Sequence, residues 1–199
     1  MSTEQKDPTR FWEERYRSAT TPWDRGGPSP ALLEWLDEEE LRPCRILVPG
    51  CGRGYEALEL ARRGFDVVAL DFAPSAVRHL RDELGRAGLR AEVLQADVLS
   101  WVSGELFDAI YEQTCLCALP PGTWARYEQQ LATWLVPGGK LLALFMQTDR
   151  EGGPPFHCDM GAMRELFAES RWEWSGAPFC EVPHPAGIYE LSTILTRRP

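Results

Sequence analysis

The chain has 199 residues, of which 44% are hydrophobic, and this is enough apolar material for one core without disulfides or metals. The formal net charge of −9 argues against a surface that follows a phosphate backbone or an anionic lipid, so we expect no nucleic-acid partner and no membrane association. No stretch approaches the roughly 18 consecutive apolar residues of a membrane helix, and the polar start MSTEQKDPTRFWEERY is unlike a signal peptide, which favours a cytoplasmic protein.

Residues 1–40 come before the first predicted strand and are rich in aromatic side chains. Trp12 and Tyr16 lie four residues apart, on one face of a predicted helix, and Trp23 follows in the string TPWDRGGPSP. This spacing is also typical of ordinary core aromatics on an amphipathic helix. We expect residues 1–40 to form a lid and a helix ahead of a Rossmann-like core at 45–199, in one monomeric domain that spans residues 1–199.

From residue 45 onward the apolar pattern predicts strands and helices in alternation, which favours a parallel sheet covered on both faces. The last two strand-like runs are joined by a short turn, so they must be antiparallel. We therefore predict an α/β fold with a seven-stranded, mostly parallel sheet that ends in a C-terminal antiparallel hairpin. This architecture is typical of class I methyltransferases rather than of nicotinamide dehydrogenases. The predicted strands are 45–50, 66–71, 91–97, 107–112, 140–147, 171–182 and 187–198, and the predicted helices are 55–64, 74–88, 121–139 and 159–170.

A glycine-rich turn joins the first predicted strand to the next helix, with Gly50, Gly52 and Gly54 at alternating positions. Residues without a Cβ let the backbone approach a ligand, and the helix N-terminus that follows favours an anionic group. Asp71 ends the second strand, where a carboxylate can accept both ribose hydroxyls. The dinucleotide pattern G-x-G-x-x-G would place its third glycine at position 55, where this chain has Tyr55. S-adenosylmethionine is therefore favoured as the cofactor over NAD.

Asp97 ends the third predicted strand at the same sheet edge as Asp71. In a class I methyltransferase layout a carboxylate there lies beside the exocyclic amine of adenine, although a lone aspartate is equally typical of a helix N-cap or a turn. Six cysteines form no CxxC pair and only three histidines are present, so we expect no metal site. The Cys115 and Cys117 pair has a redox interpretation, which we disfavour because the segment is apolar.

With these residues in view, the chain resembles the thiopurine S-methyltransferase family, and within it the halide/thiol (thiocyanate-type) branch. The resemblance covers nearly the whole chain. Its landmarks are Trp12, Tyr16, Thr21-Pro22-Trp23-Asp24, Leu47 to Gly52, Val67 to Asp71, Asp97-Val98, Phe107-Asp108, Glu112, Cys117-Ala118-Leu119-Pro120 and Gly153-Pro154-Pro155-Phe156.

The resemblance implies that the N-terminal aromatics fold over the cofactor and that Glu112 forms a wall near its methionine amino group. Animal thiopurine enzymes carry Asp-Arg where this chain has Glu112-Gln113, which argues against an aromatic thiopurine acceptor. We expect an acceptor site at Trp23, Gln113 and Phe156. The predicted cofactor-binding residues are Trp12, Tyr16, Trp23, Gly50, Cys51, Gly52, Asp71, Phe72, Asp97, Val98 and Glu112.

The predicted reaction is in-line methyl transfer to a small-molecule thiol or soft anion such as thiocyanate, a halide or hydrosulfide. An acceptor that is already an anion needs no general base, and no base constellation stands at the strand ends. Gln113 and His157 are the catalytic candidates if a protein group takes part, and His157 or His184 could serve as base for a hydroxyl or amine acceptor. The alternatives are an O- or N-methyltransferase of the same fold and, more distantly, an NAD-binding module.

Overall fold

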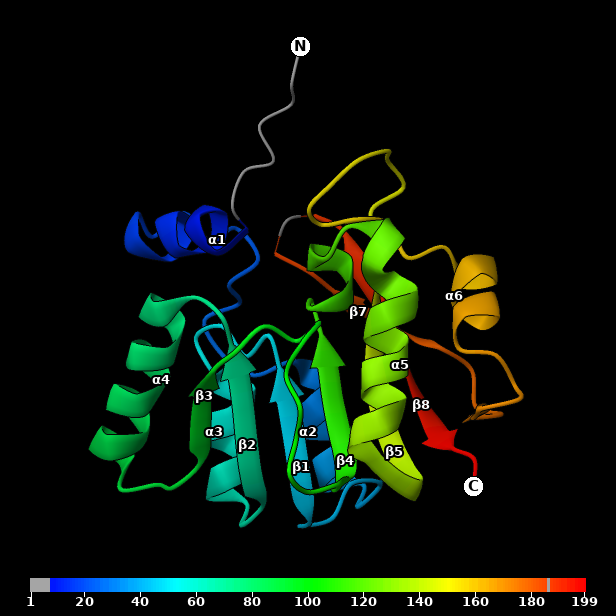
Figure 1. Cartoon of the computed structure of the whole chain (residues 1–199), viewed down its shortest axis with the longest axis horizontal. Helices are drawn as coiled ribbons and strands as arrows, with labels where there is room; N and C mark the ends of the chain where they lie inside the picture. The colour runs from blue at the N-terminus through cyan, green and yellow to red at the C-terminus, as the bar shows by residue number, and fades with distance from the viewer. Residues whose placement is uncertain (1–7, 186) are drawn as a thin grey trace.

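The computed structural model describes residues 8–185 and 187–199. The first seven residues of the expected lid and Ala186 in the expected hairpin turn lie outside the described residues. One sheet runs through the molecule in the order β3-β2-β1-β4-β5-β8-β6, and β7 also pairs with β8 (Figure 1). Its parallel strands are β1 (Arg45–Pro49), β2 (Asp66–Asp71), β3 (Glu92–Gln95), β4 (Phe107–Gln113) and β5 (Leu135–Gln147), and its antiparallel strands are β6 (Trp172–Trp174), β7 (Cys180–Pro183) and β8 (Tyr189–Arg197).

Helices cover both faces of this sheet, because successive residues of a buried strand point to opposite sides. In β2, Val67 and Ala69 join one core cluster and Val68 and Leu70 join the other. The first cluster lies under α2, α3 and α4, and the second under α5 and α6 (Figure 1). The helices are α1 (Pro8–Arg17), α2 (Pro30–Asp37), α3 (Tyr55–Arg62), α4 (Pro74–Ala87), α5 (Trp124–Trp134) and α6 (Met160–Leu166), with short 3-10 turns at Leu116–Ala118 and Pro121–Thr123.

The predicted α/β sheet with its C-terminal antiparallel strands is confirmed, with two differences in detail. The run expected as one strand at 171–182 forms two, β6 and β7, which both pair with β8, so eight strands fill the seven expected positions. Gly176 and Pro178 lie between them, and proline cannot donate to a ladder. The helix expected at 121–139 ends at Trp134, and the VPGG sequence after it begins β5 instead.

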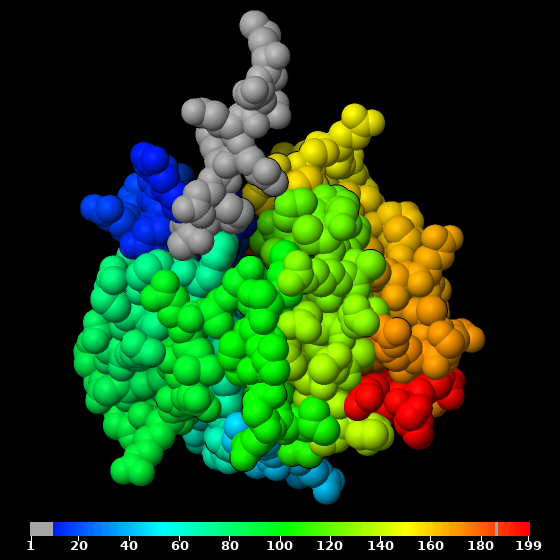
Figure 2. All heavy atoms as spheres, in the orientation of Figure 1, coloured from blue at the N-terminus to red at the C-terminus, as the bar shows by residue number. Residues whose placement is uncertain are grey.

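The parallel strands bring their carboxyl ends to one edge of the sheet, which is the edge where open α/β folds bind ligands. Figure 2 shows α1, in blue, seated on α4 at this end of the molecule, and the loop after β5, in yellow, rising on the other side. Among the described residues, no helix combines the length and the apolar character needed to cross a bilayer.

Candidate active site

A cavity of about 600 Å³ opens at the carboxyl edge of the sheet. Its β2–β3 end is formed by Asp71, Phe72, Ala96, Asp97, Val98 and Leu99. Its β5–β8 end is formed by Met146, Pro154, Pro155, Phe156 and His184. Its roof comes from the N-terminal segment, through Phe11, Trp12, Arg15, Tyr16, Pro22 and Trp23. The volume is typical of sites that take a cofactor-sized molecule, and the lining is mostly apolar.

The glycine turn forms the floor between the two ends, and its shape requires glycine. Gly50 and Gly52 have φ angles of 61° and 53°, in the left-handed region. A Cβ on Gly50 would lie 2.9 Å from the Cys115 side chain, and one on Gly52 would lie 2.9 Å from Tyr16 Oη. The turn therefore lets the backbone sit directly under the roof, with no side chain between them.

Asp71 holds this turn from the end of β2. One carboxylate oxygen accepts from the Gly52 N–H and the other from the Ala73 N–H, both at 2.9 Å. Burial raises the pKa of Asp71 to about 6, and these backbone hydrogen bonds act in the opposite direction. A carboxylate has about four lone-pair positions, so the same group can still accept from a ligand in the cavity that it lines.

The roof is assembled from contacts within the N-terminal segment and one anchor on α4. Trp23 packs edge-on against Trp12 and Tyr16, with ring centroids 5.3 and 6.1 Å apart. Glu13 accepts from the Ser75 backbone N–H at 2.9 Å and from its hydroxyl at 2.6 Å, and so supplies the cap that Ala73 cannot give to α4. Burial raises the pKa of Glu13 in part, but the hydrogen bonds from Ser75 lower it overall.

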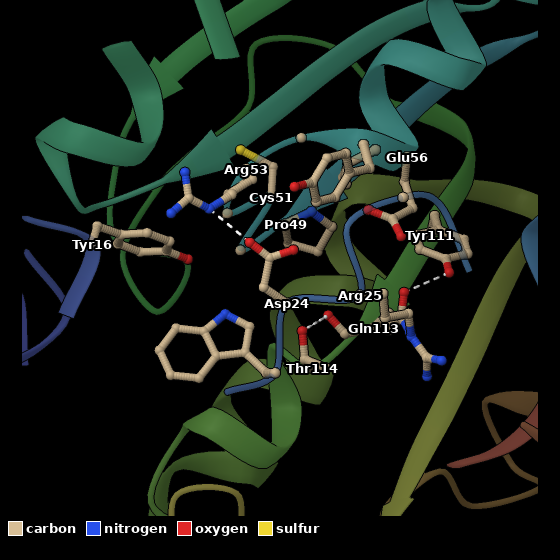
Figure 3. A pocket seen from close by; sticks show the side chains of 17 residues that line it. Tyr16, Asp24, Arg25, Pro49, Cys51, Arg53, Glu56, Tyr111, Gln113 and Thr114 are labelled. Carbon is tan, nitrogen blue, oxygen red and sulfur yellow. Dashed lines mark hydrogen bonds and ion pairs between the residues drawn. The ribbon is translucent and has the colours of Figure 1, made fainter. Parts of the chain in front are cut away.

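A second, smaller cavity of about 80 Å³ lies beside the glycine turn (Figure 3). Asp24 and Arg53 form an ion pair of 2.7 Å across it. Glu56 lies on the far side, where it accepts from the Ser29 N–H at 3.1 Å, and burial raises its pKa. This cavity is polar and charged, in contrast to the apolar β5–β8 end of the larger one.

The structure brings most of the predicted cofactor residues to these two cavities. Asp97 is exposed, lines the larger cavity and accepts from the Leu99 N–H at 2.9 Å, which is the turn arrangement considered as its alternative role. Trp12, Tyr16, Trp23, Gly50, Asp71, Phe72 and Val98 line the same cavity, and Cys51 and Gly52 line the smaller one.

Glu112 and His157 line neither cavity among the described residues. Glu112 is 1% exposed and accepts from the Leu116 N–H at 2.7 Å, and burial raises its pKa to about 8. Glu112 therefore holds the loop after β4 through this hydrogen bond, from a buried position outside both cavities. The His157 Nδ1 accepts from the Thr148 and Asp149 backbone N–H groups at 3.1 and 3.3 Å, so it holds the loop after β5.

Phe156 lines the β5–β8 end of the larger cavity, and Gln113 lines the smaller cavity instead. Both polar ends of Gln113 are engaged, because it accepts from Tyr111 Oη at 2.8 Å and donates to Glu190 at 2.9 Å. Arg25 and Glu190 are not among the predicted site residues, and they form an ion pair of 2.5 Å next to Gln113. A glutamate inside an otherwise buried strand is the one signal that could have found Glu190.

All six cysteines are free. Burial raises the thiol pKa of Cys115 and Cys117, which line the larger cavity, well above the usual value. The described residues hold no group of three or more His, Cys, Asp or Glu side chains placed to bind a metal.

The model of the thiopurine S-methyltransferase family matches residues 8–177. The chain belongs to this family. It is 34% identical over 158 residues to a probable thiol methyltransferase 2 of Arabidopsis thaliana, covering 78% of this chain and 70% of the relative. It is 33% identical over 159 residues, with the same coverage, to thiocyanate methyltransferase 1 of that plant. A thiopurine S-methyltransferase of Vibrio cholerae is 28% identical over 179 residues, with 81% of both chains covered.

Solved structures with low sequence identity share the fold. A structure from work on the conversion of a disulfide bond into a thioacetal group during echinomycin biosynthesis has a TM-score of 0.81 at 22% identity, and covers 96% of this chain and 94% of its own. The 1,6-didemethyltoxoflavin-N1-methyltransferase of Burkholderia thailandensis, with bound S-adenosylhomocysteine, has a TM-score of 0.77 at 18% identity and covers 100% and 94%. The predicted class I methyltransferase fold is thus confirmed.

The chain is an S-adenosylmethionine-dependent methyltransferase, as its family membership shows. The site fits this cofactor on three structural grounds. The backbone at Gly52 approaches the roof with no room for a Cβ. The buried Asp71 faces the cavity, and three aromatic rings of the roof can attract a sulfonium cation.

Proposed function

We propose that this methyltransferase acts on a small-molecule thiol or soft anion, such as thiocyanate, hydrosulfide or iodide. We place the nucleoside of the cofactor at the β2–β3 end of the larger cavity, where Asp71 would accept ribose hydroxyls and Asp97 the adenine amine. The acceptor then enters at the β5–β8 end. The names of the thiol and thiocyanate methyltransferase relatives support this acceptor class.

The observation that carries the proposal is the chemistry of the β5–β8 end. Met146, Pro154, Pro155 and Phe156 give it an apolar wall, and His184 is the ionisable base that lines it among the described residues. Burial, helped by the nearby Arg25, lowers the pKa of His184 to about 4, so its imidazole is neutral at pH 7. A base with this pKa is a poor acceptor for the proton of a phenol or an amine. A methyl acceptor that is already ionised needs no base.

The cofactor supplies a methyl group activated on a sulfonium. The faces of Trp12, Tyr16 and Trp23 would attract that cation by about 0.5–2 kcal/mol and exclude water from it. The apolar wall would strip water from the acceptor anion, which removes a solvation shell that opposes attack. Catalysis would then consist of positioning and water exclusion. We further propose that the enzyme is a cytoplasmic monomer. We also propose that it has no nucleic-acid partner, because its formal net charge of −9 would repel a phosphate backbone.

The test is a methyl-transfer assay with iodide, thiocyanate, hydrosulfide, an aromatic thiol, a phenol and an amine. We expect turnover of the soft anions and thiols. The rate with iodide should show no loss that follows the titration of a catalytic base, because iodide stays ionised and the pKa of His184, about 4, lies below the assay range. The rate with a thiol should rise with pH near the pKa of the thiol itself. Turnover of only the phenol or the amine, abolished in His184→Ala, would replace this proposal with a base-assisted reaction.

A further inference from the structure

We infer that Arg25 is a positioning residue for the acceptor, because it clamps the turn between β7 and β8 over the β5–β8 end of the larger cavity. This inference rests on the proposed function only for the identity of that end as the acceptor site. Arg25 follows Trp23 of the roof by two residues, so the clamp would join the roof over the cofactor to the wall beside the acceptor.

The contacts of Arg25 reach from the N-terminal segment to the far side of the sheet. One guanidinium nitrogen donates to Glu190 of β8 at 2.5 Å, and another donates to the backbone carbonyl of Pro183, the last residue of β7. These partners stand 165 and 158 positions further along the chain. The planar fork of arginine can hold both partners at once, whereas a lysine offers one point of charge.

The residue held by this contact enters the cavity. His184 follows Pro183 directly, is 6% exposed and lines the β5–β8 end. Its backbone N–H donates to the Ile188 carbonyl at 2.8 Å, which closes the turn. Arg25 therefore fixes the carbonyl immediately before the side chain that forms this part of the wall.

Glu190 ties the clamp to β4, the strand whose following loop reaches the larger cavity. The same carboxylate oxygen that pairs with Arg25 accepts from Gln113 of β4 at 2.9 Å, and Gln113 in turn accepts from Tyr111 Oη at 2.8 Å. Figure 3 shows Arg25, Gln113 and Tyr111 together beside the smaller cavity. The clamp is thus anchored on the end of β4. The loop that follows β4 contains Thr114 and Cys115, which line the larger cavity.

A purely stabilising role explains these contacts less well. The Glu190 side chain is 0% exposed, and Glu190 Oε1 and Arg25 Nε have no hydrogen-bond partner among the described residues. Buried charges with unmet hydrogen bonds add little net stability, because their desolvation offsets the attraction. Burial also raises the pKa of Glu190 to about 7, although Arg25 and Gln113 oppose that change. Such a pair is better explained by the geometry it enforces.

The experiment compares Arg25→Ala with Arg53→Ala, a matched arginine whose ion pair with Asp24 lies at the glycine turn. The first measurement is the pKa of His184 by NMR titration, which is practical because the chain has three histidines. Arg25→Ala should raise this pKa by about one unit or more, since it removes a nearby cation and admits water. Arg53→Ala should leave it near 4.

The second measurement separates the KM for thiocyanate from the Kd for S-adenosylhomocysteine. Arg25→Ala should raise the KM by about tenfold and change the Kd by less than about threefold, because the acceptor wall is displaced and the nucleoside end is intact. Arg53→Ala should weaken the Kd instead. If both variants change the same quantities, or if Arg25→Ala leaves the His184 pKa or the KM unchanged, the clamp is refuted.

Removing Arg25 leaves a buried glutamate unpaired, which could prevent folding. The double variant Arg25→Ala with Glu190→Gln removes that charge and keeps an acceptor for Gln113, and the same expectations apply to it. If the unmodified enzyme methylates neither soft anions nor thiols, the proposed function fails. The NMR measurement then tests only whether Arg25 acts on His184, because it needs no acceptor.

Discussion

Asp71→Asn separates the two tasks assigned to this carboxylate, holding the glycine turn and binding the ribose. In the native protein both oxygens accept from backbone N–H groups at 2.9 Å. Asparagine keeps one carbonyl oxygen and turns the other acceptor into a donor. One of the two backbone N–H groups is then left unsatisfied, which costs about 1–3 kcal/mol of stability.

Asp71→Asn also removes a charge whose burial opposes folding. The pKa of Asp71 rises from 3.8 to about 6 in the folded protein, which corresponds to about 3 kcal/mol against folding once the group is ionised. The folded state therefore binds the proton more tightly, so the contribution of Asp71 to stability falls as pH rises from about 4 to about 6. The two effects oppose each other near pH 7, and we expect a net change in the free energy of unfolding of at most about 2 kcal/mol.

Cofactor affinity has no such compensation. Loss of a charged acceptor for the two ribose hydroxyl groups should weaken the binding of S-adenosylhomocysteine by about 2 kcal/mol, or roughly 30-fold in Kd. The native enzyme should also lose affinity below about pH 6, where Asp71 is protonated, and Asp71→Asn should not.

Isothermal titration calorimetry at several pH values measures both effects, and thermal melting checks the fold. Asp66→Asn is the matched control, because Asp66 stands at the other end of β2 in an exposed ion pair with Arg45. A folded Asp71→Asn variant with native affinity, or with the native pH dependence, would mean that Asp71 only holds the turn.

Two further predictions concern the roof. Gly52→Ala should weaken S-adenosylhomocysteine binding, measured by calorimetry, because its Cβ would displace Tyr16 Oη. The control Gly88→Ala has a similar positive φ of 65° but open space around it, so it should cost only about 1 kcal/mol of stability. Equal Kd values for the two variants would contradict this prediction. Glu13→Ala should speed tryptic cleavage within residues 10–17 by loosening α1 from α4, while the exposed neighbour Glu14→Ala should not. Because the pKa of Glu13 is lowered in the folded state, native protection should also decline as pH falls through that pKa; a pH-independent rate would count against the anchor.

The predicted site residues that line the cavities near the glycine turn are related by local chemistry. The glycines of the turn, and Asp71 at the end of β2, are separated by one helix, and their spacing follows from a single strand-helix-strand unit. The pattern predicts a helix stop at Gly138 and Gly139, but both residues lie within β5. Glycine is needed at position 139 because a Cβ there would meet the Asp108 and Val136 carbonyls.

The positions of Glu112, Arg25 and Glu190 depend on the pleat and on distant pairing, which a local sequence pattern does not encode. Glu112 and Tyr111 are neighbours in β4, so they point to opposite faces of the sheet, and a difference of one position decides which one faces the smaller cavity. Arg25 and Glu190 meet only after the whole sheet is assembled. No local pattern encodes that meeting, apart from the presence of an acidic residue in a buried strand.

The roof shows how far a local signal can be followed. The resemblance implies that the N-terminal aromatics fold over the cofactor, and in the structure Trp23 already packs on Trp12 and Tyr16, while Glu13 fastens α1 to α4. Edge-on aromatic pairs contribute about 0.5–1.5 kcal/mol each beyond the area they bury, which is similar to what a sulfonium cation would add. Cofactor binding therefore need not create the closed arrangement. It can favour that arrangement by no more than the difference in affinity of the cofactor for the closed and open states.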